Sequence, residues 1–376
     1  CLLLQTIKIP PSVREIGAGA FENCVKLLRI FLPELEQVEE STFRHCKKLR
    51  EVHFGQNLKR IRQQAFYGCN SLDRINFPEQ LEEIGVMGFY RCVKLEKITI
   101  PETVKKIGNL AFAQSGLLEV QILSDGKEFG SDLFCDCTRL HTLLLGDGVC
   151  HIPDKLAFGC AALTRVSLPE TIESVGRNAF EKTPFLKAWK EEFARVNNGG
   201  KENENLLSHI FLDGSDLGGE FILPANFRII AGGAYYGNTR ITKICLHKNV
   251  IWVGRAAFKG CTALTGVVWS KICDAEPEIF SGCGELEIIE NAPSWKTVGE
   301  RAFWGCKKLA RLDLSKVEWI GKETFTDCAC LEKGEVGTAR YIGESAFVNT
   351  PYTYRKESVF KRNPIGNELP SIEVAS

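Results

Sequence analysis

Residues 65–78 decide the fold, and they read Ala65-Phe66-Tyr67-Gly68-Cys69-Asn70-Ser71-Leu72-Asp73-Arg74-Ile75-Asn76-Phe77-Pro78. The general form of this stretch, A-F-x-x-C-x-x-L-x-x-I-x-[IF]-P, returns along almost the whole chain. Its aromatic anchor recurs at steps of 22 to 24 residues, apart from one gap of 55, at Phe21, Phe43, Phe66, Phe89, Phe112, Phe134, Phe158, Phe180, Tyr235, Phe258, Phe280, Phe303, Phe325 and Phe347. A fixed period in the twenties predicts a solenoid that grows by adding repeats.

The spacing inside one repeat predicts a turn followed by a strand. Ala65, Cys69 and Leu72 are four and three residues apart, so a short helical turn would place them on one face. Ile75 and Phe77 would then point inward from an extended segment. The residues between them, at positions 74 and 76, would point outward.

A second, shorter strand is expected on the opposite side of each coil, with Val104 and Ile107 as its buried residues in one repeat. A glycine often follows this segment, four residues before the anchor. We expect a positive φ at this glycine, which occurs at Gly17, Gly85, Gly108, Gly130, Gly176, Gly254, Gly299, Gly321 and Gly343.

The repeat resembles that of the BspA-type (Treponema-type) leucine-rich repeat family, which occurs in cell-surface proteins of bacteria and of some parasitic protists. The resemblance covers roughly residues 1–186 and 221–352. It implies an α/β repeat fold, a right-handed leucine-rich-repeat solenoid with a long parallel β-sheet, short helical turns and about 14 repeats. The chain starts at the cysteine of the pattern, so we expect it to begin inside a repeat.

The gap of 55 residues predicts an excursion from the solenoid. Thr183-Pro184 has the composition of a helix start, and Phe185, Trp189 and Phe193 follow at spacings of four. We expect this amphipathic helix to end at residues 197–200, a polar loop at 201–205 and a strand at 208–212. The predicted organisation is a first array at 1–183, an insertion at 184–220, a second array at 221–352 and a C-terminal cap or linker at 353–376.

The chain has sixteen cysteines. Parallel side chains in a stacked column do not converge as a disulfide requires, so we expect buried free thiols. No metal site is expected, although Cys135-Asp136-Cys137 and Cys328-Ala329-Cys330 are close pairs. Eleven cysteines occupy the pattern's cysteine position, namely Cys1, Cys24, Cys46, Cys69, Cys92, Cys137, Cys160, Cys261, Cys283, Cys306 and Cys328.

Composition and motifs exclude several classes of function. Lysine plus arginine and aspartate plus glutamate number 47 each, so no net field draws the chain to nucleic acid. No apolar run reaches the roughly 18 residues of a membrane span. The six histidines are scattered, and no nucleophile or phosphate-binding motif occurs. We expect no enzyme activity and no cofactor.

The outward positions of the long sheet are the candidate binding residues. The position two after the repeat leucine is mostly basic, and Glu119 and Val120 compete for it in one shortened repeat. A solvated stripe explains this pattern, and so does a surface for an acidic protein segment or an anionic glycan. The predicted contact residues are Arg29, Arg74, Asn76, Lys97, Thr99 and Arg165, and a second candidate is the apolar set Phe31, Leu144, Ile222 and Val268.

The family resemblance implies a non-catalytic module that binds a macromolecule at a cell surface or after secretion. Its ligand would be a protein or a glycan, for example a host extracellular protein. Two alternatives stay open. The chain could be an intracellular interaction scaffold, where free thiols persist, or the targeting module of a larger enzyme.

Overall fold

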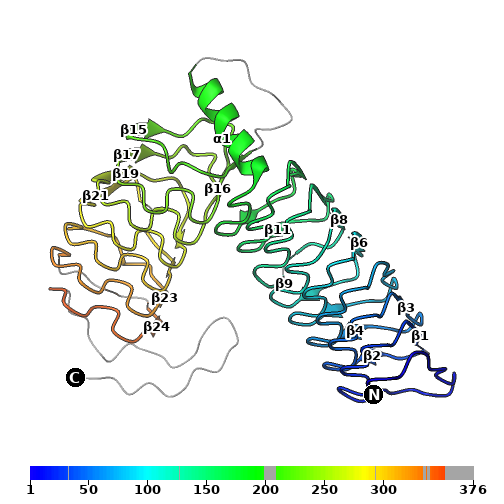
Figure 1. The fold of residues 1–376 in the computed structure, drawn as a ribbon. Helices are drawn as coiled ribbons and strands as arrows, with labels where there is room; N and C mark the ends of the chain where they lie inside the picture. Colours follow the sequence, from blue (N-terminus) through cyan, green and yellow to red (C-terminus); the bar gives the residue numbers. More distant parts are fainter. Residues whose placement is uncertain are drawn as a thin grey trace. The chain divides into compact units, whose positions relative to one another are not determined.

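The computed structural model describes residues 1–32, 34–126, 128–198, 209–292, 294–332, 336 and 339–351. Contacts divide the chain into two units, Cys1–Leu207 (unit 1) and Ser208–Ser376 (unit 2). Each unit is a stack of coils, here called rungs, with strands on two sides of most rungs (Figure 1). The predicted C-terminal segment at 353–376 and the predicted loop at 201–205 lie outside the described residues.

Unit 1 has two columns of parallel strands. The longer strands form the sheets β1-β3 and β6-β8-β10-β12, with a single bridge from Glu51 to Arg74 on the rung between them. They are β1 (Arg29–Phe31), β3 (Glu51–His53), β6 (Lys97–Ile100), β8 (Glu119–Ile122), β10 (Thr142–Leu145) and β12 (Arg165–Ser167). The predicted second column is confirmed, as β2 (Gln37–Val38), β4 (Arg60–Ile61), β5 (Glu83–Ile84), β7 (Lys106–Ile107), β9 (Glu128–Phe129), β11 (His151–Ile152) and β13 (Ser174–Val175).

Unit 2 repeats this architecture. Its longer strands form the sheet β15-β17-β19-β21, from β15 (Gly219–Ile222), β17 (Ile241–Cys245), β19 (Gly266–Val268) and β21 (Ile288–Glu290). Its short strands are β14 (Ile210–Phe211), β16 (Ile229–Ile230), β18 (Trp252–Val253), β20 (Asp274–Ala275), β22 (Thr297–Val298), β23 (Trp319–Ile320) and β24 (Tyr341–Ile342). Strand β14 pairs with β16, so the stack of unit 2 includes residues before the predicted start at 221.

A ladder of stacked aromatic rings runs through the core of each unit. Ring centroids of successive anchors from Phe21 to Phe134 lie 5.1 to 5.8 Å apart. In unit 2 the ladder continues from Tyr235 to Phe347 at 5.1 to 5.5 Å. Phe211 of β14 stacks on Tyr235 at 5.2 Å and supplies the ring for the first rung. The 22-residue period therefore places one ring directly above another.

Phe158 was predicted to be an anchor, and this prediction is wrong. The backbone N–H of Phe134 bonds to the carbonyl of Leu156, and that of Ala157 bonds to the carbonyl of Ala179, which is the pattern of anchor positions elsewhere. Ala157 therefore occupies the ladder and is fully buried, whereas Phe158 is half-buried. This repeat has one residue fewer between its phenylalanine and its cysteine, Cys160, which shifts the ring out of the core.

The segment around each anchor is a pair of tight turns instead of the expected helical turn. Residues two before and two after the anchor both have positive φ, for example Gln64 (54°) and Gly68 (68°), or Leu110 (58°) and Gln114 (54°). Left-handed residues reverse the chain direction, so they bring the anchor and the cysteine inward without a helix. The only α-helix of the described residues is α1 (Pro184–Asn197).

The glycines four residues before the anchors do not have positive φ, which corrects the prediction. Eight of the nine are explained by close packing between rungs, and the exception is Gly17, where a Cβ would have no neighbour within 4 Å. A Cβ at Gly108 would lie 2.3 Å from the backbone nitrogen of Val86, and one at Gly85 would lie 2.4 Å from that of Gln63. Glycine is required here because the backbone of the preceding rung occupies the space of a side chain.

The cysteine column consists of free thiols, as predicted, and all sixteen cysteines are free. Ten of the eleven column members are buried, and Cys1 is exposed. Nine thiols donate to the carbonyl oxygen of an anchor on the preceding rung at 3.0 to 3.3 Å, from Cys46, Cys69, Cys92, Cys137, Cys160, Cys261, Cys283, Cys306 and Cys328. The slot therefore selects a small side chain that can donate a hydrogen bond.

Helix α1 follows the last anchor of unit 1. Thr183 caps it by accepting a hydrogen bond from the backbone N–H of Leu186, and Pro184 is its first residue, both as predicted. Phe185, Trp189 and Phe193 are buried. The helix therefore continues the apolar core beyond the last strand pair of unit 1.

Candidate binding surface

The strands of the long sheet of unit 1 pair in register, so their outward-facing side chains form two columns along the stack. One column runs through Arg29, Glu51, Arg74, Lys97, Glu119, Thr142 and Arg165. The other contains Phe31, His53, Asn76, Thr99, Gln121, Leu144 and Ser167. Of the six predicted contact residues, all are exposed. We call this surface the outer sheet face of unit 1.

The charges on this face are less uniform than the sequence indicated. Strand pairing places Glu119 in the contested slot, opposite Lys97, and their side chains form an ion pair at 3.4 Å. Among the described residues, Arg29, Arg74 and Arg165 make no ion pair. The cations available to a partner are therefore three arginines, of which Arg29 and Arg74 lie two rungs apart, about 10 Å at the usual strand spacing.

An aromatic pair lies beside these two arginines, with Phe31 on the rung of Arg29 and His53 on the rung between the arginines. The ring of Phe31 is 56% exposed and stacks on the imidazole of His53, with centroids 4.4 Å apart and planes 4° from parallel. Nε2 of His53 is 3.6 Å from the carboxylate of Glu51. Sequence reasoning missed His53, although its position relative to the repeat leucine is the same as that of Phe31. The structure thus brings Arg29, Phe31 and His53 together, and Arg165 lies several rungs away.

The corresponding face of unit 2 has a different character. Ile222 is 74% exposed and Ile288 is 53% exposed. Lys243 reaches across the rung of Gly266 to Glu290, with Nζ and Oε1 3.0 Å apart, and this bond raises the pKa of Lys243. The predicted apolar residue Val268 is half-buried beside them. Lys243 on this face is therefore already paired.

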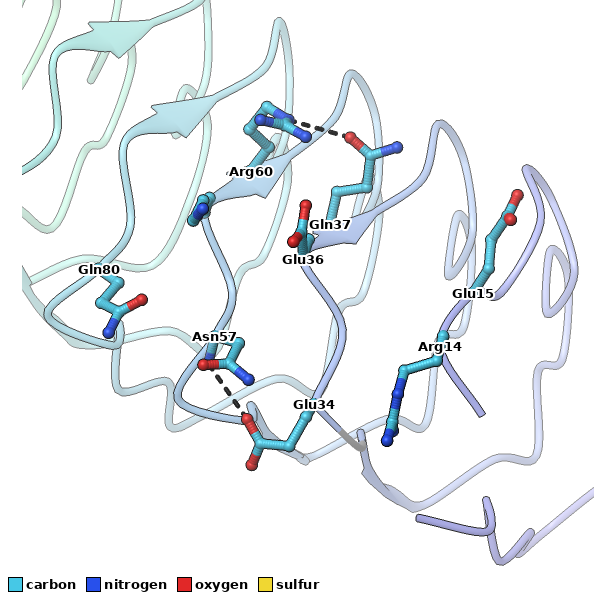
Figure 2. Close-up of a pocket in the computed structure, with 9 residues that line it drawn as sticks. Arg14, Glu15, Glu34, Glu36, Gln37, Asn57, Arg60 and Gln80 are labelled. Atoms are coloured by element: carbon cyan, nitrogen blue, oxygen red, sulfur yellow. Dashed lines mark hydrogen bonds between the residues drawn. The ribbon is translucent and has the colours of Figure 1, made fainter. Parts of the chain in front are cut away.

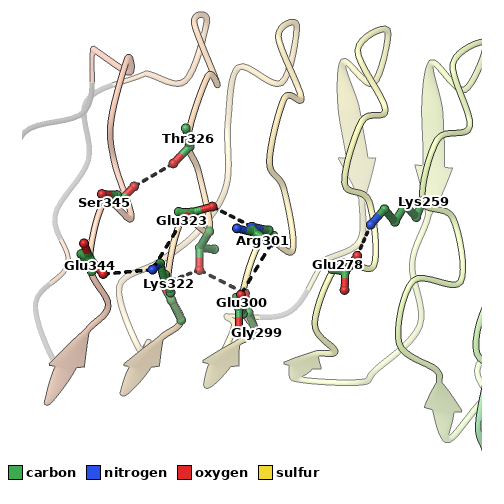
Figure 3. Close-up of polar contacts among 12 residues, drawn as sticks. Lys259, Glu278, Gly299, Glu300, Arg301, Lys322, Glu323, Thr326, Glu344 and Ser345 are labelled. Carbon is green, nitrogen blue, oxygen red and sulfur yellow. Dashed lines mark hydrogen bonds and ion pairs between the residues drawn. The ribbon is translucent and has the colours of Figure 1, made fainter. Parts of the chain in front are cut away.

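Unit 2 carries its charges on a turn edge, in a network that links successive rungs (Figure 3). Lys259 bonds the buried carboxylate of Glu278, as Figure 3 shows. Arg255 also bonds this carboxylate. Burial alone would raise the pKa of Glu278, but these two bonds outweigh it and lower the pKa to about 2. Two further rungs are joined by Arg301 with Glu323 at 2.6 Å and by Lys322 with Glu344 at 3.0 Å. The network holds rungs together and leaves little charge for a ligand.

The described part of the chain shows no candidate metal site, and its buried thiols are weakly acidic. No cluster of three or more histidine, cysteine, aspartate or glutamate residues converges there as metal ligands. Burial raises the pKa of the thiols of Cys46 and Cys328 to about 12, so these groups are not nucleophiles at neutral pH. Among the described helices, none has the length and apolarity to cross a membrane.

Fold and surface together define a repeat protein of the parallel β-solenoid class. The residues that differ from repeat to repeat lie on the outer faces. The particular family follows from the sequence model for the BspA type leucine rich repeat region, which matches residues 1–119, 82–190, 209–288 and 270–357. The chain belongs to the BspA-type leucine-rich repeat family. The resemblance found in the sequence is thereby confirmed.

Solved structures similar to this chain are also leucine-rich repeat proteins. A leucine-rich repeat protein from Bacteroides ovatus is 26% identical, covering 93% of this chain and 91% of its own, with a TM-score of 0.46. The T. pallidum leucine-rich repeat protein is 28% identical over 50% of this chain and 79% of its own, with a TM-score of 0.35. A leucine-rich cell surface protein from Faecalibacterium prausnitzii is 20% identical over 96% and 83%, with a TM-score of 0.37. The comparison with curated proteins gave no match.

Proposed function

We propose that this chain is a protein-binding module that acts at a cell surface or after secretion, without catalysis. We propose the outer sheet face of unit 1 as its contact surface. The observation that carries the proposal is the exposed Phe31–His53 stack beside the unpaired arginines Arg29 and Arg74. The presence of the family in surface proteins supports the location.

The energetics of interfaces favour this part of the face. Aromatic rings and arginines contribute most of the binding energy in many protein complexes, because they combine large apolar area with directed hydrogen bonds. The stack holds the ring of Phe31 in place before a partner arrives, so less side-chain entropy is lost on binding. A protein ligand with an apolar side chain next to one or two carboxylates fits this arrangement.

The experiment is a binding screen of the purified chain against extracellular matrix proteins, glycans and host cell lysate. For a ligand found this way, Phe31→Ala with His53→Ala should weaken binding at least about tenfold, since truncating a central anchor costs about 2 kcal/mol or more. Arg29→Glu with Arg74→Glu should weaken it to a similar degree and reduce its salt dependence.

Two controls make the result specific to this face. Lys47→Glu with Lys48→Glu changes the charge equally at exposed residues of unit 1 off this face. Ile222→Ala removes an exposed apolar residue from unit 2. Binding that survives the changes at Phe31, His53, Arg29 and Arg74 would disprove the proposed surface.

An intracellular interaction scaffold is a second candidate, because the sixteen free thiols are typical of reducing compartments. Protease treatment of intact cells separates the two locations. A surface protein loses its folded repeat region to external protease, whereas an intracellular scaffold is protected until the cells are lysed.

A further inference from the structure

The short-strand side of unit 1 carries four charged rows whose signs alternate from rung to rung. The acidic rows are Glu36, which is followed by the uncharged Gln37, and Glu82 with Glu83; the basic rows are Lys59 with Arg60, and Lys105 with Lys106. Glu128 pairs with Lys106 on the following rung and continues the alternation. The order along the stack is therefore acidic, basic, acidic, basic. Unit 2 also has charged residues at equivalent positions, namely Asp274, Lys296, Glu318 and Arg340, and there Arg340 pairs with Glu318 at 3.8 Å.

Backbone pairing places these rows next to one another. Strands β2, β4, β5 and β7 are in register, so Arg60, Glu83 and Lys106 are successive neighbours. The N–H groups of both residues in a row bond to one carbonyl of the previous row, as those of Lys59 and Arg60 do to Glu36. Adjacent rows are therefore about 4.8 Å apart.

Most of the charge in these rows is unpaired within the chain. Glu83 takes part in ion pairs with Arg62 at 3.4 Å and Lys106 at 4.0 Å. Within the described residues, Glu36, Lys59, Glu82 and Lys105 take part in no ion pair, even though each has a row of opposite sign beside it. These four side chains are available to a partner.

The first two rows border a polar hollow of about 690 Å³ (Figure 2). It is lined by Arg14, Glu15, Glu34, Glu36, Gln37, Asn57, Lys59, Arg60 and Gln80, with no apolar residue among them. Arg60 donates to the amide of Gln37 at 3.0 Å, and the backbone N–H of Asn57 donates to Glu34 at 3.2 Å. The hollow can therefore receive long charged side chains next to the carboxylate of Glu36.

We propose that the charged rows of unit 1 bind the same rows of a second copy of this chain, related by a twofold axis between the second and third rows. The twofold axis reverses the order of the rows in the partner. Each acidic row then faces a basic row: Glu36 faces the position of Lys105 and Lys106, and Lys59 and Arg60 face that of Glu82 and Glu83. The long lysine side chains of the fourth row enter the hollow of the other copy.

A second copy fits this pattern better than a partner of one sign. A uniformly acidic or basic ligand would meet a row of like charge on every other rung, which is destabilising. A twofold contact uses one surface twice and pairs all four rows, and twofold dimers are the commonest symmetric assemblies. The charged rows are on the short-strand side, so this inference is independent of the outer sheet face.

Sedimentation equilibrium of the full chain tests the proposal, at protein concentrations up to about 1 mM so that a dimer with a Kd near 1 mM is still detected. We expect a monomer–dimer equilibrium that weakens with salt, because the contacts are exposed charges. Lys59→Glu with Arg60→Glu should weaken the dimer at least about tenfold, and so should Glu82→Lys with Glu83→Lys, since each brings like charges together. The control Lys47→Glu with Lys48→Glu should leave the dimer unchanged.

Mixing the two charge-reversed variants gives the decisive measurement. In the mixed dimer each reversed row meets a row of opposite sign, so the two variants should associate with each other at least about tenfold more tightly than either does with itself. Circular dichroism confirms that both variants are folded. A chain that stays monomeric throughout, or variants that do not associate on mixing, would overturn the proposal.

Discussion

The cores of the two units are built in the same way, whereas their outer sheet faces differ. Both stack aromatic rings at 5.1 to 5.8 Å and both place thiols against anchor carbonyls. On its outer sheet face, unit 1 leaves Arg29 and Arg74 unpaired among the described residues, whereas unit 2 pairs Lys243 with Glu290. The repeated contacts therefore involve the residues that stack, whereas the charges on the outer sheet faces differ between the two units.

Removing a ring from the ladder should have the largest effect, and it should be equal in the two units. Phe66→Ala and Phe280→Ala each remove a buried ring stacked on both sides, and each should lower the free energy of unfolding by about 3 to 5 kcal/mol. Denaturant unfolding measures this loss. A much smaller loss in one unit would show that its ladder contributes less to stability. That result would contradict the view that the two cores are equivalent.

Replacing glycine by alanine should destabilise the protein where the glycine packs against the preceding rung, and should have little effect where it lies on the outer sheet face. Gly108→Ala places a Cβ 2.3 Å from backbone of the preceding rung, so we expect a loss of about 2 to 3 kcal/mol. Gly266→Ala is the matched control, because its nearest neighbour is a side-chain atom of Ile288 at 3.6 Å, an ordinary contact distance. Equal stability of the two variants in thermal unfolding would refute the explanation by close packing.

Acid should weaken the turn-edge network of unit 2. The folded-state pKa of Glu278 is lowered from 4.5 to about 2, so its stabilising effect is full above pH 4.5 and is lost as the pH falls towards 2. Glu278→Gln should therefore cost about 2 kcal/mol at pH 7 and progressively less below pH 4.5. Glu344→Gln, at an exposed ion pair, is the control and should cost less than about 1 kcal/mol at any pH.

The buried cysteines of unit 1 and unit 2 should react with thiol reagents at similar rates. This is the smallest effect that we expect. In the native state an alkylating reagent should modify exposed Cys1 and Cys330 quickly, and the ten buried column thiols slowly. In denaturant without reductant, close to sixteen thiols should react. A count below about ten would mean that disulfides form, contrary to the free thiols observed here.

Much of the fold could be predicted from sequence because burial repeats with the period. The second strand column, the cap at Thr183 and the thiol column follow from residue types at fixed offsets. The displacement of Phe158 could not be predicted by counting phenylalanines, because the ladder position is defined by the left-handed pair Lys155 and Gly159 around Ala157. The reason for glycine at position 108 was missed because a side chain there would collide with the backbone of another rung, which the sequence does not show.

The candidate surface was predictable only in part. The outward direction of Arg29, Arg74 and Lys97 follows from strand alternation, and they are exposed as expected. Ion pairs between neighbouring rungs decide which charged side chains remain free to contact a ligand. The sequence of a single repeat does not reveal these pairs. Glu119 neutralises Lys97 because a shortened repeat moves it into register.

The left-handed pairs have a consequence for how such chains gain stability over evolutionary time. Residues such as Met87 and Leu110 hold a φ of 54° and 58°, a conformation that glycine adopts without steric cost. Most rungs of the described residues thus contain backbone strain that a single change to glycine could release without altering the ladder. Unit 2 has glycine at the position two after the anchor on four successive rungs, at Gly237, Gly260, Gly282 and Gly305. A chain built this way carries a distributed reserve of stabilising mutations, which can offset destabilising changes on its outer faces.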